Sequence, residues 1–508
     1  MNLTDALSIA SGGIANVNAQ LAVVSQNIAN ASTPGYAVET APQESLTGLG
    51  TGLGVRTGPA QRQIDQALND SLTQQNGTVS GLATTQTALQ SIDAVLGSVG
   101  QGNDLGSLLG ALQGKFSTLL TDPSSQAAQS AAVAAAGTLA SGINSLSDAY
   151  TQQRQAAQTS LVGEVNTLNQ TLATIGKLSD QIVAATPGGQ GTADLENQRD
   201  AALQTLSGLL NVKTVPQSNG DLMIFTSAGA ELPTHTRSGP FSIAGGSAQP
   251  GAYYPGGGLP GIMLGGADVT SGMIGGQIGA NLTLRDKTLP TYQAETDEFA
   301  ANLSSRFAAQ GLTLFTDPTG AVPSGGGTPV QSTYVGYAAT IQVNPAVAAS
   351  PSLVRDGTNA VTGSAAGASA FTPNPTGGPA GFTTLISRVL NYALGSEAQT
   401  GVAQPAFNTT GLGPSGTLTT SLSGQTTLAG YAAGMISAQS AQSATTTTQL
   451  STEQALQTVL NNQVNAVSGV SIDTEMSKMI ALQNAYSANA RIITAAQSMF
   501  TQLLQATQ

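Results

Sequence analysis

The first thirty residues place apolar side chains at alternating intervals of four and three positions. This alternation predicts a helix that buries one stripe against a partner, as in a coiled coil. Pro34 and Gly35 then end the helix, because proline disfavours a helical residue before it and glycine permits a turn. The stripe consists of Leu3, Leu7, Ala10, Ile14, Val17, Leu21, Val24 and Ile28.

The other end of the chain carries a second stripe, which begins after Ser468 and Gly469. It consists of Ile472, Met476, Met479, Leu482, Tyr486, Ile493, Met499, Phe500 and Leu503. Two stripes of similar length are most simply buried against each other. We therefore predict that the terminal helices pair, which brings the two chain ends together.

Helical periodicity also dominates much of the middle of the chain. The predicted helices cover about residues 64–96, 105–120, 124–185, 195–210, 282–310, 382–394 and 428–467. Alternation at 212–225 predicts a hairpin around Ser218–Asp221, and short β-type runs continue to residue 282. The remaining segments are expected to be an extended arm at 40–58, an irregular region with a strand at 341–347, and a loop at 395–423.

The predicted fold is mainly α with inserted β. It has terminal coiled-coil helices, a helical bundle domain and an outward mainly-β domain in an elongated multidomain chain, because 508 residues exceed one hydrophobic core. The predicted domains are 1–58 with 469–508 for the terminal helices and their arm, 59–211 with 283–310 and 382–468 for the bundle, and 212–282 with 311–381 for the Gly-rich outer domain.

Composition excludes several functions. Only 8% of residues are charged and the net charge is −12, which argues against binding nucleic acid, because phosphate contacts need clustered Lys and Arg. The chain has no cysteine and one histidine, so thiolate and multi-histidine metal sites are excluded, and we expect no cofactor. A surface poor in charge favours recognition through shape and amide hydrogen bonds.

An enzyme is the first rival interpretation. His235 lies in a Gly-rich region and is the histidine that a Ser-His-Asp hydrolase would need. No Gly-x-Ser-x-Gly elbow lies near it, and the chain has no His-Glu-x-x-His motif, so we predict no catalytic residues. A secreted adhesin would also account for the small polar composition.

The sequence shows no classical targeting signal. The first basic residue is Arg56, so a positively charged leader is lacking, and no uninterrupted apolar run approaches about 20 residues. We expect neither signal-peptide cleavage nor membrane insertion.

Both ends carry signature-like motifs. Asn27–Tyr36 (NIANASTPGY) resembles the N-terminal signature of the flagellar axial family of rod, hook and hook-associated proteins. Ser468–Met476 (SGVSIDTEM) and Gln483–Ile492 (QNAYSANARI) resemble its C-terminal signature. Within that family, Leu195–Leu203 (LENQRDAAL), Gly275–Ala280 with Arg285–Pro290, and Val343–Ala346 resemble the hook-associated protein 1 branch.

The resemblance implies a structural subunit at the junction between hook and filament. It implies self-association, contacts with the hook protein and with a second junction protein on the filament side, and a type III export chaperone at the C-terminal helix. It also implies an extracellular position on the flagellum, reached by export without a cleaved signal peptide. Another axial component, of hook or rod, is the nearest alternative.

The terminal helices are the expected assembly interface. On the N-terminal side it comprises Leu3, Leu7, Ile14, Val17, Leu21, Val24, Asn27, Ile28, Asn30, Pro34, Gly35 and Tyr36. On the C-terminal side it comprises Ile472, Met476, Met479, Leu482, Tyr486, Asn489, Ile493, Phe500 and Leu503. Asn27, Asn30 and Asn489 are expected either to bridge subunits or to be solvated. Gly12 and Gly13 weaken the first helix, so we expect both ends to order fully only on assembly.

Overall fold

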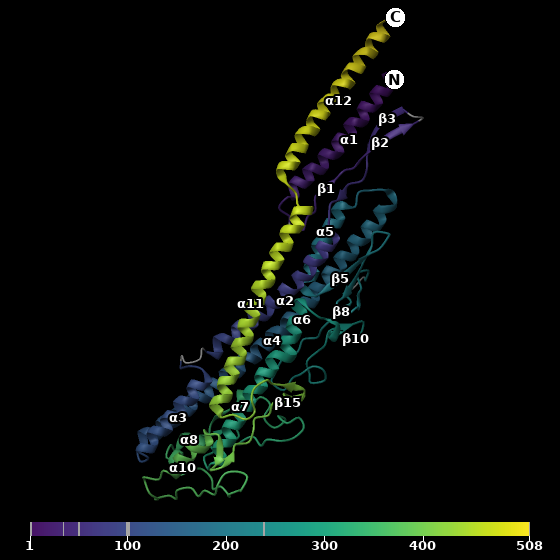
Figure 1. The fold of residues 1–508 in the computed structure, drawn as a ribbon. Coiled ribbons are helices and arrows are strands. Elements are labelled where there is room, and N and C mark those ends of the chain that lie inside the picture. Colours follow the sequence, from purple (N-terminus) through teal and green to yellow (C-terminus); the bar gives the residue numbers. More distant parts are fainter. Residues whose placement is uncertain (1–2, 34, 49–50, 98–101, 237–238, 507–508) are drawn as a thin grey trace.

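The computed structural model describes residues 3–33, 35–48, 51–97, 102–236 and 239–506. The molecule is a long rod of helices with both chain ends at the same tip (Figure 1). This tip is formed by α1 (Leu3–Asn30) and α12 (Ile472–Ala506), which pack side by side and run in opposite directions. The predicted pairing of the terminal helices is therefore confirmed.

A bundle of long helices forms the body of the rod, as predicted. Its helices are α2 (Gln66–Leu96), α3 (Leu105–Thr121), α4 (Gln126–Ala185), α5 (Ala193–Leu209), α6 (Gly276–Thr283), α7 (Leu289–Ala309) and α11 (Leu428–Ser468). Side-chain caps begin several of them: Asp65, Asp104, Ser125 and Thr427 each accept a backbone N–H from the first turn. At 60 residues, α4 is about 90 Å long and spans most of the body.

The helix that leads into α7 begins six residues earlier than predicted. α6 starts at Gly276, and a π-helical turn at Leu284–Thr288 joins it to α7. Gly275 precedes the helix with a φ of 78°, and Gly276 has a φ of 58°, conformations that favour glycine. The two glycines hid this start, because glycine is a poor helix former.

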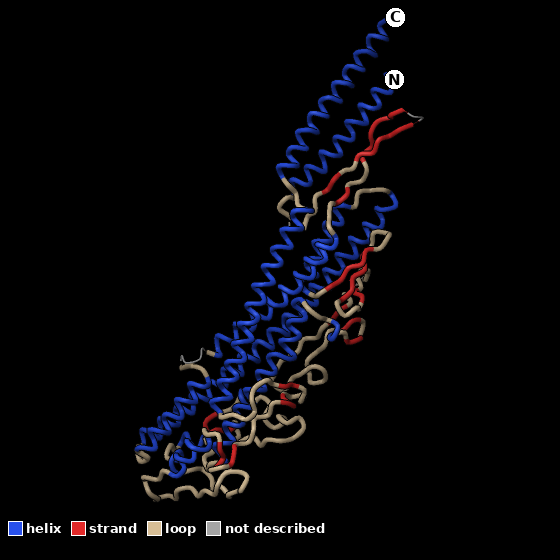
Figure 2. Tube along the Cα trace, in the orientation of Figure 1, coloured by secondary structure: helices blue, strands red, loops and turns tan. Residues whose placement is uncertain are grey.

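All strands are short, and most of the non-helical chain is loop (Figure 2). The sheets are β1 (Glu39–Thr40) with β4 (Gln61–Arg62); β2 (Gln43–Gly48) with β3 (Thr51–Thr57); β5 (Val212–Pro216), β6 (Leu222–Thr226) and β7 (Glu231–Leu232); β8 (Phe241–Ser242), β9 (Met263–Leu264) and β10 (Ala267–Asp268); β11 (Phe315–Thr316) with β12 (Gln342–Val343); β13 (Glu397–Gln399) with β14 (Val402–Ala403); and β15 (Thr410–Leu412) with β16 (Leu418–Thr419). All of these strand pairs are antiparallel.

Small helices complete the fold. They are α8 (Pro345–Ala349), α9 (Leu353–Asp356), α10 (Thr384–Arg388), a π-helical turn at Val389–Ala393, and 3-10 turns at Thr186–Gly188, Thr270–Gly272 and Tyr337–Ala339. The hairpin predicted at 212–225 is confirmed as β5 and β6, and the expected arm at 40–58 contains the β2–β3 hairpin, which packs along α1.

The two segments predicted to form the Gly-rich outer domain lie along different lengths of the bundle. Among the described residues, no strand of 212–282 pairs with a strand of 311–381. The two segments also belong to different hydrophobic clusters. Residues of 212–282 pack with α5 and with α4 from Leu161 onwards, whereas residues of 311–381 pack with α3, α7 and the earlier part of α4. The apolar side chains of each segment thus cover a different length of the bundle.

The composition of α1 bears on the prediction that the chain does not insert into a membrane. By length and composition, Thr4–Asn30 is apolar enough to cross a bilayer, with a mean hydropathy of 1.3 over its best window. This was not predicted from the sequence, because polar amide side chains interrupt the apolar residues of this helix. Asp5 is its one charged residue. In the structure this helix packs against α12 and β3.

Candidate functional site: the terminal helix pair

The predicted interface residues of α1 divide by burial. Val17 and Val24 are buried, and Leu7, Ile14, Leu21 and Ile28 are half-buried. The side chain of Leu3 and the whole of Pro34 lie outside the described residues. The stripe of α1 therefore faces its own chain, chiefly α12 and the β2–β3 hairpin.

The predicted interface residues of α12 fall into two sets. Met479, Leu482, Asn489 and Ile493 are half-buried on the side that faces α1. Exposed are Ile472, Met476, Tyr486, Phe500 and Leu503. The prediction did not name Ile480 and Ile492, which are 57% and 48% exposed, nor the buried Ala496. Helical spacing alone did not identify these residues, because it does not show how much of the surface of α12 is covered by α1.

Five polar residues meet where the helix pair joins the body, and we call them the base cluster: Asn27, Tyr36, Glu39, Asn197 and Glu475. Asn27 is fully buried and uses both ends of its amide. Its Nδ2 donates to the Glu39 carbonyl at 2.9 Å and to Glu475 Oε2 at 3.1 Å. Its Oδ1 accepts from the Glu39 N–H at 3.0 Å and from the Tyr36 hydroxyl at 2.9 Å. Within the chain, the Asn27 amide is therefore shielded from solvent, and its oxygen and nitrogen both have partners.

The base cluster continues into the body through Asn197 on α5. Asn197 Oδ1 accepts from the Ala37 N–H, and its Nδ2 donates to the Ala37 carbonyl and to Glu39 Oε1 at 3.0 Å. Burial raises the pKa of Glu39, and burial likewise raises the pKa of Tyr36, with Glu39 nearby adding to the effect. Tyr36 is thus a neutral hydrogen-bond donor to Asn27.

Two further contacts hold the base. Arg62 pairs with Glu196 at 2.8 Å and Asp200 at 2.5 Å, and its side chain is only 7% exposed. The Val38 N–H donates to the carbonyl of Ser468, the last residue of α11, at 2.7 Å. Sequence reading missed Arg62, because nothing in the local pattern shows that β4 lies beside α5.

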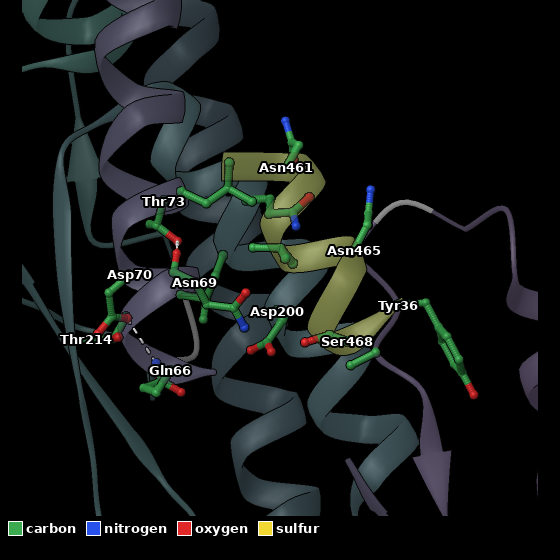
Figure 3. A pocket seen from close by; sticks show the side chains of 16 residues that line it. Tyr36, Gln66, Asn69, Asp70, Thr73, Asp200, Thr214, Asn461, Asn465 and Ser468 are labelled. Carbon is green, nitrogen blue, oxygen red and sulfur yellow. Dashed lines mark hydrogen bonds between the residues drawn. The ribbon is translucent and has the colours of Figure 1, made fainter. Parts of the chain in front are cut away.

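A polar cavity of about 80 Å³ lies beneath this junction (Figure 3). The turn at Gly35–Ala37 closes one side of the cavity. The first turns of α2 and the last turns of α11 form two further sides. Asn69, Asn461 and Asn465 are among its amide lining. Gly35 has a φ of 78°, and a Cβ there would lie 2.8 Å from Gln204 Nε2, so both backbone and space favour glycine.

The other two asparagines have local roles. Asn30 Nδ2 donates to the Gln26 carbonyl at 3.1 Å, and its Oδ1 accepts from Thr33 at 3.2 Å, which ties down the end of α1. Asn489 lies over Gly13, where a Cβ would come within 3.0 Å of both its Nδ2 and its Oδ1. The glycine thus forms a notch in α1 for the amide of α12.

His235 lies near two carboxylates and a hydroxyl group. Its Nε2 lies 3.4 Å from Asp180 and 3.7 Å from Asp221, and its Nδ1 lies 3.0 Å from the adjacent Thr234 hydroxyl. These contacts tie a loop to α4 and to the β5–β6 turn. Within the described ranges, no three His, Cys, Asp or Glu side chains are grouped so as to hold a metal ion.

Comparison with known proteins matches three family profiles to this architecture. The flagellar hook-associated protein FlgK helical domain matches residues 89–321, the flagella basal body rod protein matches 7–36, and the flagellar basal body rod FlgEFG protein C-terminal matches 462–506. The chain is 24% identical to flagellar hook-associated protein 1 of Escherichia coli over 99% of this chain and 100% of that protein. The chain thus matches flagellar hook-associated protein 1, with rod-family segments at both ends.

All of the matches are to flagellar proteins of the hook and rod. The homologue of Salmonella typhimurium is 25% identical over 61% of this chain, and the match spans only 56% of that protein's length. A solved structure of the flagellar hook junction protein FlgK from Burkholderia pseudomallei is 26% identical, with a TM-score of 0.40 over 50% of this chain and 46% of that one. The two rod-type matches coincide with α1 and α12, the helices that the base cluster joins.

Proposed function

We propose that the chain is a structural subunit that joins the flagellar hook to the filament, and that its terminal helix pair is the surface through which it polymerises. The observation that carries this proposal is the state of α12. One side of the helix packs on α1, while large apolar side chains on its flanks remain exposed.

The exposed flank is a costly surface for a protein that stays alone. Ile472, Ile480, Ile492 and Met499 are each about half exposed or more, at 51%, 57%, 48% and 50%. The sequence after Arg491 contains no charged residue. Large apolar side chains left exposed along a helix favour association, because covering them stabilises the assembly by roughly 25 cal/mol per Å² of apolar surface buried. Neighbouring copies supply such a cover in a tubular layer.

The proposed partners follow from this position. Copies of the chain lie beside one another in the layer, the hook protein lies on one side, and the second junction protein lies on the filament side. Before assembly, an export chaperone covers the C-terminal helix. The assembled protein is extracellular and leaves the cell by the flagellar type III route without a cleaved signal peptide. The named relatives are hook-associated and hook junction proteins, which supports this placement.

The division into units also remains a proposal. We propose that residues 1–58 with 469–508 act as the assembly unit, and that the helical bundle acts as a rigid body carrying the Gly-rich segments on its outside. The contacts of Asn197 with Ala37 and Glu39, and that of Val38 with Ser468, support this, because they join the two units at one place.

The test places a charge on the exposed flank. In a strain that lacks the gene, the chain with Ile480→Asp and Ile492→Asp should leave hooks without filaments and flagellin in the medium, because a buried unpaired carboxylate opposes assembly. Ser487→Asp, at an exposed polar position of the same helix, is the matched control and should restore filaments. Electron microscopy and flagellin in the culture medium are the readouts.

The alternatives give other outcomes. Normal filaments with both aspartates in place would contradict assembly through this flank. A hook or rod component would leave the strain without complete hooks when the gene is deleted. A secreted adhesin or hydrolase would keep its activity after deletion of residues 1–40, whereas a junction subunit would lose assembly.

A further inference from the structure

The apolar seam between α1 and α12 does not by itself fix how the two helices are aligned. In α1 the seam repeats every seven residues, so a slip of one heptad places Leu7, Ile14 and Leu21 at the levels of Ile14, Leu21 and Ile28. The seam side of α12 also follows a spacing of seven: Met479 and Ile493, which are half-buried, lie seven residues on either side of Tyr486, which is 41% exposed. A slipped pair would therefore keep apolar side chains against apolar side chains, while the helices moved by about 10 Å.

Two polar contacts do not survive such a slip. Asn27 donates to Glu475, and Asn489 lies over Gly13. These contacts lie far apart along the pair, yet their residue numbers, 27 with 475 and 13 with 489, both add up to 502. Two independent observations thus define one antiparallel register.

Each contact penalises the shifted alternatives. Moving α12 by one heptad places Asn27 opposite Leu482 in one direction and beyond the start of α12 in the other, so its buried amide loses Glu475 as a partner. The same movement takes Asn489 away from the only glycines of α1, Gly12 and Gly13, and sets it against Ala6 or Gln20. At Gly13 a Cβ would already press on the amide at 3.0 Å, so the notch is not reproduced elsewhere.

We infer that Asn27 with Glu475, and Gly13 with Asn489, set the register of the terminal helix pair, whereas the apolar seam supplies its cohesion. A buried polar residue in a seam of this kind specifies alignment at some cost in stability. The consequence for assembly rests on the proposed function: register decides which part of α12 extends past α1 toward a neighbour. Asn27 and Glu475 are positioning residues in this sense.

The natural chain has no cysteine, which permits a direct competition experiment. One full-length variant carries Val17→Cys with both Ala485→Cys and Ile492→Cys. Residue 485 is level with 17 in the observed register, and 492 is level with it after a slip of one heptad. Mild oxidation followed by mass spectrometry gives the ratio of the two disulfides, which we expect to favour 17–485 by at least about tenfold.

Adding Asn27→Leu and Glu475→Leu to the same variant should bring this ratio close to one while the helix pair persists. Gly13→Ala should lower it independently. Asn18→Leu, at an exposed position of α1, is the matched control and should leave the ratio unchanged. Glu475→Gln keeps an oxygen that accepts from Asn27 and should preserve the preference.

Equal yields of the two disulfides in the natural background would overturn the inference, as would an unchanged ratio after both leucine substitutions. Binding of each variant to isolated hooks is measured separately. A chain that keeps the 17–485 preference but fails to bind hooks would contradict the proposed function and leave the register inference standing.

Discussion

Helices α4 and α12 are both long and carry apolar residues at helical spacing, yet they differ in how much of their surface the chain buries. α4 buries residues along its whole length, and Ile143, Leu161 and Ile175 have no exposed surface. Among the described residues of α12, only Glu475 and Ala496 are buried. A periodic stripe therefore shows that a helix needs a cover. It does not show whether the cover belongs to the same chain.

The largest expected difference between these regions is in amide hydrogen exchange of the free chain. Amides of α4 should exchange only through global unfolding, whereas those of α1 and α12 should open locally, because one partner helix covers part of their stripes. We expect exchange in the terminal pair to be faster by about three orders of magnitude or more, with the slowest amides beside the base cluster. Equal protection in both regions would show that the pair is complete without neighbours.

Truncation of side chains sharpens the same comparison. Phe307 is fully buried, with ring centroids of Phe116 and Phe315 at 6.1 and 5.5 Å. Phe307→Ala should lower the free energy of unfolding by about 3–5 kcal/mol in urea titrations, because it leaves a cavity in the body. Ile480→Ala, at an exposed position of α12, should change it by no more than about 0.5 kcal/mol. A similar loss for both would mean that the flank of α12 is covered within the chain.

A smaller effect comes from a carboxyl group inside the body. Burial raises the pKa of Glu164 to about 7 from its ordinary value of 4.5. Its Oε1 accepts from Asn281 at 2.6 Å, and its Oε2 is buried without a hydrogen-bond partner among the described residues. The folded chain thus holds this proton more tightly than the unfolded chain does. The stabilisation by protonation is present below pH 4.5 and is lost as the pH rises through about 7.

Glu164→Gln removes this titration and keeps an oxygen for Asn281. The variant should exceed the natural chain by about 1–2 kcal/mol in unfolding free energy at pH 8, after allowance for partial exposure, and should lose most of that advantage at pH 5. Urea titrations at the two pH values measure the difference. An advantage that did not depend on pH would assign the effect to packing instead.

Sequence reasoning was strongest where the periodicity was long. The ends of α1, α3 and α11 lie within about a residue of the predicted limits, because Pro34, the Asp104 cap and Gly469 mark them directly. It was weakest in the Gly-rich segments, where no stripe indicates which surface covers them. The start of α6 was lost to Gly275 and Gly276, although their backbone conformation is what begins the helix.

The site shows the same limit. Spacing predicted which faces of α1 and α12 are apolar, and the motif around Asn27 marked a residue of interest. The role of Asn27 depends on Glu39 and Glu475, which contact it from two other parts of the chain, and on Asn197, which holds Glu39. Convergence of this kind follows from tertiary packing, which no local pattern records.

The unbroken length of α4 has a mechanical consequence. It begins near the far end of the rod, ends beside the terminal tip, and contributes side chains to both hydrophobic clusters (Figure 1). A twist or pull applied at the tip therefore travels through one continuous ladder of backbone hydrogen bonds, with no loop along the way to absorb it. The body should respond to load as a single stiff beam, and bending should concentrate where the chain narrows to the few connections around Val38 and Ser468.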